Sequence, residues 1–118
     1  NMMYALYQAL NDVKNEGLNN VLNRHTIVHH KLVEGLAGIG LEMLVDEQMR
    51  LPSLNAVKIP SGNDDMFVRS TLLNDFDIEI GGGLGPFAGK VWRIGLMGHS
   101  AQEENVDRLL DAFGQILV

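Results

Sequence analysis

The residue with the clearest chemical potential in this 118-residue chain is an arginine inside an apolar stretch. Residues 91–97 read Val-Trp-Arg-Ile-Gly-Leu-Met, an alternation typical of a strand, with Arg93 in its middle. A guanidinium stays charged, so its burial is costly without a partner. Its planar fork matches a carboxylate through two parallel hydrogen bonds, which makes Arg93 a candidate carboxylate-binding residue. The competing interpretations are a side chain that reaches solvent and one that pairs with a structural carboxylate.

A glycine-rich turn precedes this strand, and its spacing excludes two phosphate-binding motifs. Gly89-Lys90 is followed by Val91 where the nucleoside-triphosphate loop requires Ser or Thr. Gly83-x-Gly85-x-x-Ala88 leads into a strand, whereas the dinucleotide fingerprint leads into a helix. What remains is a hairpin that lets a backbone or a ligand approach closely. The candidate pocket-lining residues in it are Gly82, Gly83, Leu84 and Gly85.

Histidines offer a weaker signal for a metal site. His25 and His29 stand four residues apart on one helical face, followed by His30, and Glu34 is the one acidic residue of that helix able to assist. Surface or half-buried histidines are the favoured interpretation, and no metal site is predicted. His99 is expected to be a loop residue near a pocket.

Catalytic groups are not indicated elsewhere. Asp75, Asp77 and Glu79 could supply a general acid and base, but a solvated strand edge is the favoured interpretation. No sequence context marks any lysine as a Schiff-base nucleophile; the lysines are Lys14, Lys31, Lys58 and Lys90. Residue types and spacing therefore mark no catalytic group in this chain.

Composition limits the function classes. Nine Lys and Arg against 15 Asp and Glu give 9 − 15 = −6, which disfavours nucleic acid and anionic membranes as partners. Without cysteine there is no disulfide and no thiol nucleophile. No apolar run approaches the roughly 18 residues of a membrane span, and neither a secretion signal nor a C-terminal peroxisomal signal is present. We expect a soluble protein with the cytoplasm favoured, and the compartment is otherwise unknown.

Periodicity predicts the elements that position Arg93. An amphipathic helix is expected at 2–16, and a second follows from 18 to Gly38 or Gly40. Further elements are a strand at 41–45, a polar loop at 46–52, a strand at 54–59, a helix beginning near Asn63 or Asp64, strands at 78–80 and 91–97, and a last helix opened by a capping box at 100–103.

The predicted fold is α/β, an α+β sandwich in the order α-α-β-β-α-β-β-α. About four mostly antiparallel strands are covered by helices. Residues 1–118 are expected to be one domain. The first helix has little to pack on, so residues 1–16 are expected to link two domains of a longer protein from which this chain is a piece.

Residues 76–98, FDIEIGGGLGPFAGKVWRIGLMG, and Glu104-Asn-Val-Asp-Arg108 resemble the C-terminal region of one enzyme family. It is the alanine–glyoxylate/serine–pyruvate type of class V, fold-type I aminotransferases, which depend on pyridoxal phosphate. The similarity extends back through Arg50-Leu-Pro52 and Glu16-Gly-Leu-Asn-Asn-Val21 to Tyr4. Gly81 departs from the family pattern, which often has a methionine there.

The resemblance implies that the chain is the small domain of such a transaminase, a homodimer in which Arg93 binds the carboxylate of an amino or 2-oxo acid. The cofactor and the catalytic residues would lie on a large domain absent from this chain, so the chain alone is expected to bind no pyridoxal phosphate and to be inactive. The implied reaction moves an amino group from alanine or serine to glyoxylate or another 2-oxo acid; ureidoglycine–glyoxylate transamination is the alternative within the family. A free-standing, non-catalytic α/β module that binds a small carboxylate, or that dimerises, is the alternative outside it.

Overall fold

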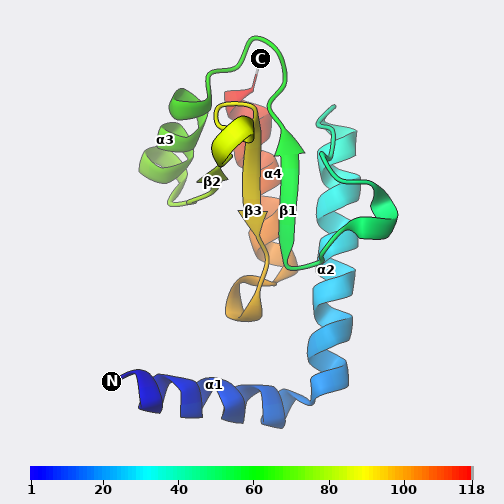
Figure 1. Ribbon diagram of the computed structural model, residues 1–118, viewed down its shortest axis with the longest axis vertical. Coiled ribbons are helices and arrows are strands. Elements are labelled where there is room, and N and C mark those ends of the chain that lie inside the picture. Colours follow the sequence, from blue (N-terminus) through cyan, green and yellow to red (C-terminus); the bar gives the residue numbers. More distant parts are fainter. Residues whose placement is uncertain (118) are drawn as a thin grey trace.

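A computed structural model describes residues 1–117 of the chain. Its helices are α1 (Met2–Glu16), α2 (Leu18–Gly38), α3 (Asp65–Phe76) and α4 (Glu103–Ile116); its strands are β1 (Leu54–Lys58), β2 (Gly81–Gly82) and β3 (Val91–Gly95). Short 3-10 turns occupy Glu47–Met49, Gly85–Phe87 and Gly98–Ser100. The small sheet stands between α3 and α2, with α4 behind it and α1 projecting at the base (Figure 1). The predicted α/β class is confirmed.

The sheet is antiparallel, with β3 in the centre and β1 and β2 on either side. In this register Arg93 lies between Ala56 of β1 and Gly81 of β2. The described chain therefore contributes three strands to this sheet, and the prediction of about four is wrong in number.

The predicted strand at 41–45 is not a strand. This segment approaches β1 through a single bridge between Met43 and Val57, flanked by hydrogen bonds from Lys58 N to Glu42 O (2.8 Å) and from Leu44 N to Ala56 O (2.9 Å). The chain then turns into the 3-10 turn at Glu47, so the contact ends after one bridge. The strand predicted here is therefore reduced to one bridged residue, Met43.

The predicted strand at 78–80 is replaced by irregular backbone, and only Gly81–Gly82 pairs with β3. The amide of Ile78 donates to Leu72 O (3.0 Å), and the preceding Asp77 takes a left-handed conformation (φ 55°) that ends α3. The helix C-terminus thus uses backbone groups that a strand would have offered to the ladder. Ile80 is still buried, so its apolar side chain serves the core without a strand.

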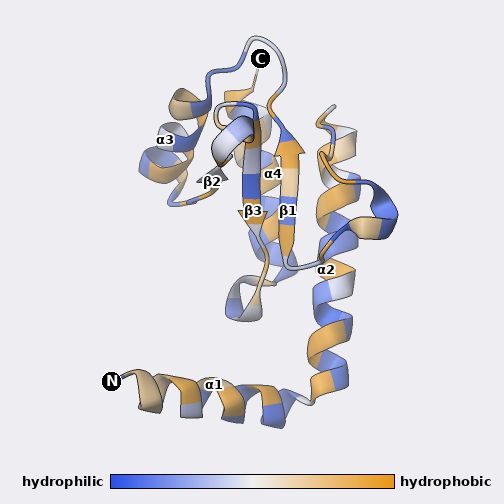
Figure 2. Cartoon of the chain, viewed as in Figure 1, coloured by the Kyte–Doolittle hydropathy of each residue, from blue (hydrophilic) through white to orange (hydrophobic). Residues whose placement is uncertain are grey.

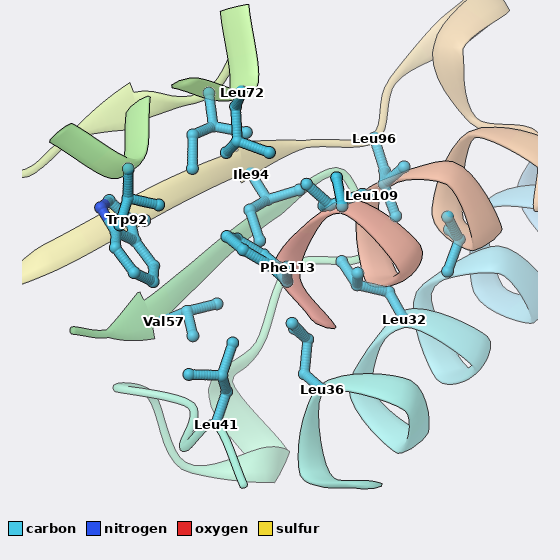
Figure 3. Packing of buried hydrophobic residues seen from close by; sticks show 14 of the residues in the cluster. Leu32, Leu36, Leu41, Val57, Leu72, Trp92, Ile94, Leu96, Leu109 and Phe113 are labelled. Carbon is cyan, nitrogen blue, oxygen red and sulfur yellow. The ribbon is translucent and has the colours of Figure 1, made fainter. Parts of the chain in front are cut away.

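The inner face of the sheet forms the core (Figure 3). Alternation along 91–97 places Trp92, Ile94 and Leu96 on one face, opposite Arg93, and these three are buried together against Leu32 of α2 and Phe113 of α4. The rings of Trp92 and Phe113 stack with centroids 5.4 Å apart. Burying side chains of this size stabilises the fold by about 1.5–3 kcal/mol each. Their burial fixes the face of β3 on which Arg93 emerges.

The predicted N-terminal cap of α3 is confirmed, and the predicted capping box of α4 is wrong. The side chain of Asp64 caps α3 by accepting a hydrogen bond from Phe67 N (2.7 Å). The expected capping box at Ser100 does not form, because Ser100 belongs to the preceding 3-10 turn and its hydroxyl donates to Met97 O (2.9 Å). Helix α4 begins after Gln102 without a side-chain cap.

Helix α1 stands apart from the core, at a steep angle to α2 (Figure 1). Gly17, with φ 88°, separates the two helices. Arg24 stabilises this junction by donating hydrogen bonds to both carboxylate oxygens of Glu16 (2.6 and 2.9 Å) and to the carbonyls of Gly98 and Ala101. No residue of α1 is buried, and hydrophobic residues recur along the helix (Figure 2). No helix within residues 1–117 has the length and apolar content to span a bilayer.

A buried histidine predicts how stability depends on pH. His29 is 7% exposed, and its Nδ1 lies 2.8 Å from Asn55 Oδ1. Burial lowers the pKa of His29 below its usual 6.5; the Asn55 hydrogen bond opposes this, while His30 and Arg50 add to it. The folded state therefore favours the neutral ring. The contribution of neutral His29 to the free energy of unfolding is complete above the pKa of the unfolded state. It is lost as the pH falls through the lowered pKa of the folded state.

We expect the free energy of unfolding to fall on acidification below about pH 6.5, by at most about 1.4 kcal/mol per pH unit for this one proton. Urea titrations at several pH values measure it. The variant His29→Gln should flatten the dependence in this window. His30→Gln, at an exposed neighbour that contributes only a minor part of the lowering, should keep most of it. An unchanged slope in His29→Gln would assign the effect to another group.

Candidate functional site

Arg93 lies half-buried at the centre of the sheet's outer face. Its Nε donates to Gly82 O at 2.7 Å. Within residues 1–117 it forms no ion pair with any carboxylate, and its terminal nitrogens Nη1 and Nη2 make no hydrogen bond. The interpretation that a structural carboxylate neutralises it is therefore excluded for the described chain. The fork is oriented by one bond and retains its capacity to bind a carboxylate.

Three consecutive glycines lie beside the strand of Arg93, and a side chain at each would meet a different neighbour. A Cβ at Gly81 would lie 3.3 Å from Arg93 Nη2, so the guanidinium rests directly over the backbone there. A Cβ at Gly82 would point to the opposite face and meet Arg69 Cζ at 3.2 Å. A Cβ at Gly83 would lie 2.0 Å from Phe87 O, which leaves no room for a side chain. The side chains of Arg93 and Arg69 and the backbone of Phe87 thus approach this glycine run so closely that they would have to shift to admit a larger residue.

A hollow of about 180 Å³ adjoins Arg93 on the β1 side. Its walls are largely apolar, and its lining comprises Met43, Val45, Met49, Arg50, Leu51, Leu54, Ala56 and Arg93. Arg50 is fixed there by a hydrogen bond from its Nε to Val45 O (2.8 Å). The hollow offers a small organic acid an apolar wall beside a guanidinium. Sequence reasoning missed Arg50 and this wall, because residues 41–51 reach β1 only through the tertiary fold.

The other predicted pocket residues occupy mixed positions. Gly82 supplies the carbonyl that orients Arg93. Gly83 packs against the turn, Leu84 is exposed, and Gly85 opens the 3-10 turn with φ 53°. None of the four lines the hollow beside Arg93. Their role around a ligand stays a prediction.

The histidines do not come together as a metal site, and residues 1–117 contain no cluster of three or more metal-ligating side chains. His25 Nδ1 lies 2.7 Å from Val21 O, and its Nε2 accepts a hydrogen bond from Gly98 N (3.0 Å). His99 lines a hollow of about 560 Å³ beside α1, consistent with the predicted loop residue near a pocket. Asp75, Asp77 and Glu79 are exposed, so the predicted solvation holds. The predicted strand edge does not, because Asp75 lies in α3 and 77–79 precede β2.

The chain's own residues do not fit pyridoxal phosphate as a covalent cofactor. Lys31 pairs with Asp107 and Glu103, and Lys58 pairs with Glu42. None of the hollows described for residues 1–117 has a lysine in its lining.

Comparison with known proteins gives the chain its family. No family model matches the sequence. The chain is 40% identical over 119 residues to (S)-ureidoglycine–glyoxylate transaminase of Bacillus subtilis, and 41% identical over 116 residues to alanine–glyoxylate aminotransferase of Felis catus. These alignments cover 99% and 98% of the chain. Alanine–glyoxylate aminotransferase from Nostoc sp. superposes with a TM-score of 0.94 at 48% identity, over 98% of this chain and 30% of that one.

The chain corresponds to a C-terminal portion of a class V aminotransferase of the alanine–glyoxylate and ureidoglycine–glyoxylate type. It spans about 28% of the length of these two curated relatives. Pyridoxamine–pyruvate aminotransferase from Mesorhizobium loti shares the fold at 28% identity, with a TM-score of 0.85 over 92% of this chain and 28% of that one. The predicted family is confirmed, and this aminotransferase portion contains the Arg93 site described above.

Proposed function

We propose that this chain is the small domain of a transaminase, in which Arg93 binds the carboxylate of an amino acid or 2-oxo acid substrate. One observation carries the proposal. A half-buried guanidinium is oriented through Nε by Gly82 O (2.7 Å) and has no carboxylate partner within the described residues. A bound carboxylate would supply the missing charge and hold the substrate in one orientation.

The substrates we propose follow from the relatives and from the site. The relatives carry the names of alanine–glyoxylate and ureidoglycine–glyoxylate aminotransferases. We favour alanine or serine as amino donor and glyoxylate or another 2-oxo acid as acceptor, with ureidoglycine as the alternative donor. The small volume and apolar wall of the hollow beside Arg93 suit a short side chain.

Residues outside this chain would complete the enzyme. In this proposal a large domain holds pyridoxal phosphate, which supplies the amino-transfer chemistry when bound, and the enzyme works as a homodimer. Helix α1 would link the two domains. Its exposed apolar residues support this, since Met3 and Tyr7 are 73% and 68% exposed in the chain alone.

The test compares this chain with the same chain extended to the full length of its relatives. With pyridoxal phosphate, the extended protein should retain the bound cofactor's absorbance and convert alanine and glyoxylate into pyruvate and glycine. The 118-residue chain should do neither, because none of its described hollows offers a lysine. A stoichiometric cofactor band on the short chain, or an extended protein that transfers no amino group from any of the three proposed donors, would refute the proposal.

A further inference from the structure

Strand β2 lies between two guanidinium groups. Arg93 covers its outer face at Gly81, and Arg69 of α3 covers its inner face, with Cζ, Nη2 and Nε 3.2–3.3 Å from the Cβ position of Gly82. The strand has two residues and no side chains of its own. The residues before and after Gly81–Gly82 do not pair with β3. Packing by Arg69 therefore replaces the contacts that side chains on β2 would make.

Arg69 is itself held in place by an ion pair. Its Nε and Nη2 donate to Oδ1 and Oδ2 of Asp65 at 2.8 and 3.1 Å, and both side chains are largely shielded from solvent. Such a bidentate geometry fixes the plane of the guanidinium. Arg69 lowers the pKa of Asp65, which keeps this carboxylate ionised at neutral pH. Asp65, one helical turn before Arg69 on α3, therefore holds in place the guanidinium that covers Gly82.

The same carboxylate also reaches the strand that contains Arg93. Asp65 Oδ1 accepts a hydrogen bond from Trp92 Nε1 (3.0 Å), and Trp92 pairs with Gly82 across the β2–β3 ladder. Asp65 and Arg69 thus hold β2 and β3 together from the inner face. On the outer face, the Gly82 carbonyl makes the hydrogen bond that orients Arg93. A displacement of Gly82 would move this acceptor and with it the fork.

We propose that Arg69 and Asp65 are positioning residues for Arg93, which aim its fork at the substrate carboxylate by fixing the carbonyl of Gly82. This inference rests on the proposed function of Arg93. Arg69 does not contact the ligand in this arrangement, because it lies on the opposite face of β2. Its effect therefore passes through Gly82, and losing it should weaken carboxylate binding without removing the group that binds.

The experiment measures KM and kcat of the complete aminotransferase with alanine and with ethylamine, which lacks the carboxylate. We expect Arg69→Gln to raise KM for alanine about tenfold and to change kcat by less than about twofold. A tenfold change lies within the coupling free energies measured between residues of one hydrogen-bond network. Turnover of ethylamine should not change. Arg69→Lys should recover part of the loss, since it keeps a cation near Asp65 without the fork.

A matched control and a double variant separate positioning from general destabilisation. Lys31→Gln removes the ion pairs that join α2 to Asp107 and Glu103 of α4, which involve neither β2 nor α3, and should leave KM for alanine unchanged. On an Arg93→Gln background, Arg69→Gln should add no further increase in KM. Equal increases on both backgrounds, or equal losses for alanine and ethylamine, would overturn the positioning role. If Arg93→Gln itself lowers activity with alanine and with ethylamine by the same factor, the proposed function fails instead.

Discussion

Replacing Arg93 by glutamine in the complete aminotransferase is expected to lower kcat/KM for alanine by about 30- to 5,000-fold, equivalent to 2–5 kcal/mol. Glutamine keeps a hydrogen-bond donor but removes the charge and the fork. The substrate carboxylate would then enter a half-buried site without a counter-charge, and its desolvation would go uncompensated. The substrate would also lose the orientation that two parallel bonds provide.

Steady-state kinetics with alanine and ethylamine measure this directly. Ethylamine should be a poor substrate of both proteins, with similar rates, because it never had a carboxylate to bind. Arg93→Lys should be intermediate for alanine, since it restores charge but not bidentate geometry. Loss of the same factor for both substrates would show that Arg93 supports the site's structure, and would contradict its role as a carboxylate anchor.

The sequence predicted the part of the fold that burial determines. Alternation along 91–97 assigned Trp92, Ile94 and Leu96 to one face, and all three are buried in the core. The helices were similarly predictable, because apolar residues recur at helical spacing and Gly17 and Asp64 mark boundaries. Strand pairing was less predictable. Whether 41–45 or 78–80 forms a ladder depends on which distant backbone groups are available, and the end of α3 uses the Ile78 amide.

Within the site, Arg93 could be singled out because a lone charge in an apolar strand requires a partner. Its surroundings could not. The Asp65–Arg69 pair has the i, i+4 spacing of an ordinary helix-surface ion pair. Only the packing of α3 beside β2 brings Arg69 over Gly82. Arg50 likewise reaches the hollow because residues 41–51 lie beside β1. These contacts are long-range, and local pattern does not encode their geometry.

Gly83→Ala is expected to be the most destabilising of the single-methyl additions in the glycine turn, lowering the free energy of unfolding by about 2–4 kcal/mol. Its Cβ would lie 2.0 Å from Phe87 O and 2.6 Å from Phe87 C, both backbone atoms that no rotamer change can move. Phe87 O accepts from Lys90 N (3.0 Å), and Phe87 N donates to Leu84 O (3.1 Å). Relieving the overlap therefore requires breaking part of the turn that leads into β3.

Urea unfolding followed by fluorescence measures this change, because Trp92 is the single tryptophan and is buried in the core. Gly114→Ala is the matched control, since Gly114 lies inside α4 and its added Cβ would meet nothing within 4 Å. Alanine there should be neutral or stabilise the helix by up to about 1 kcal/mol. Because β3 begins directly after this turn, Gly83→Ala should also reduce the alanine preference of the complete enzyme. If the two alanine variants unfolded at the same urea concentration, the close approach of Gly83 to Phe87 would be refuted.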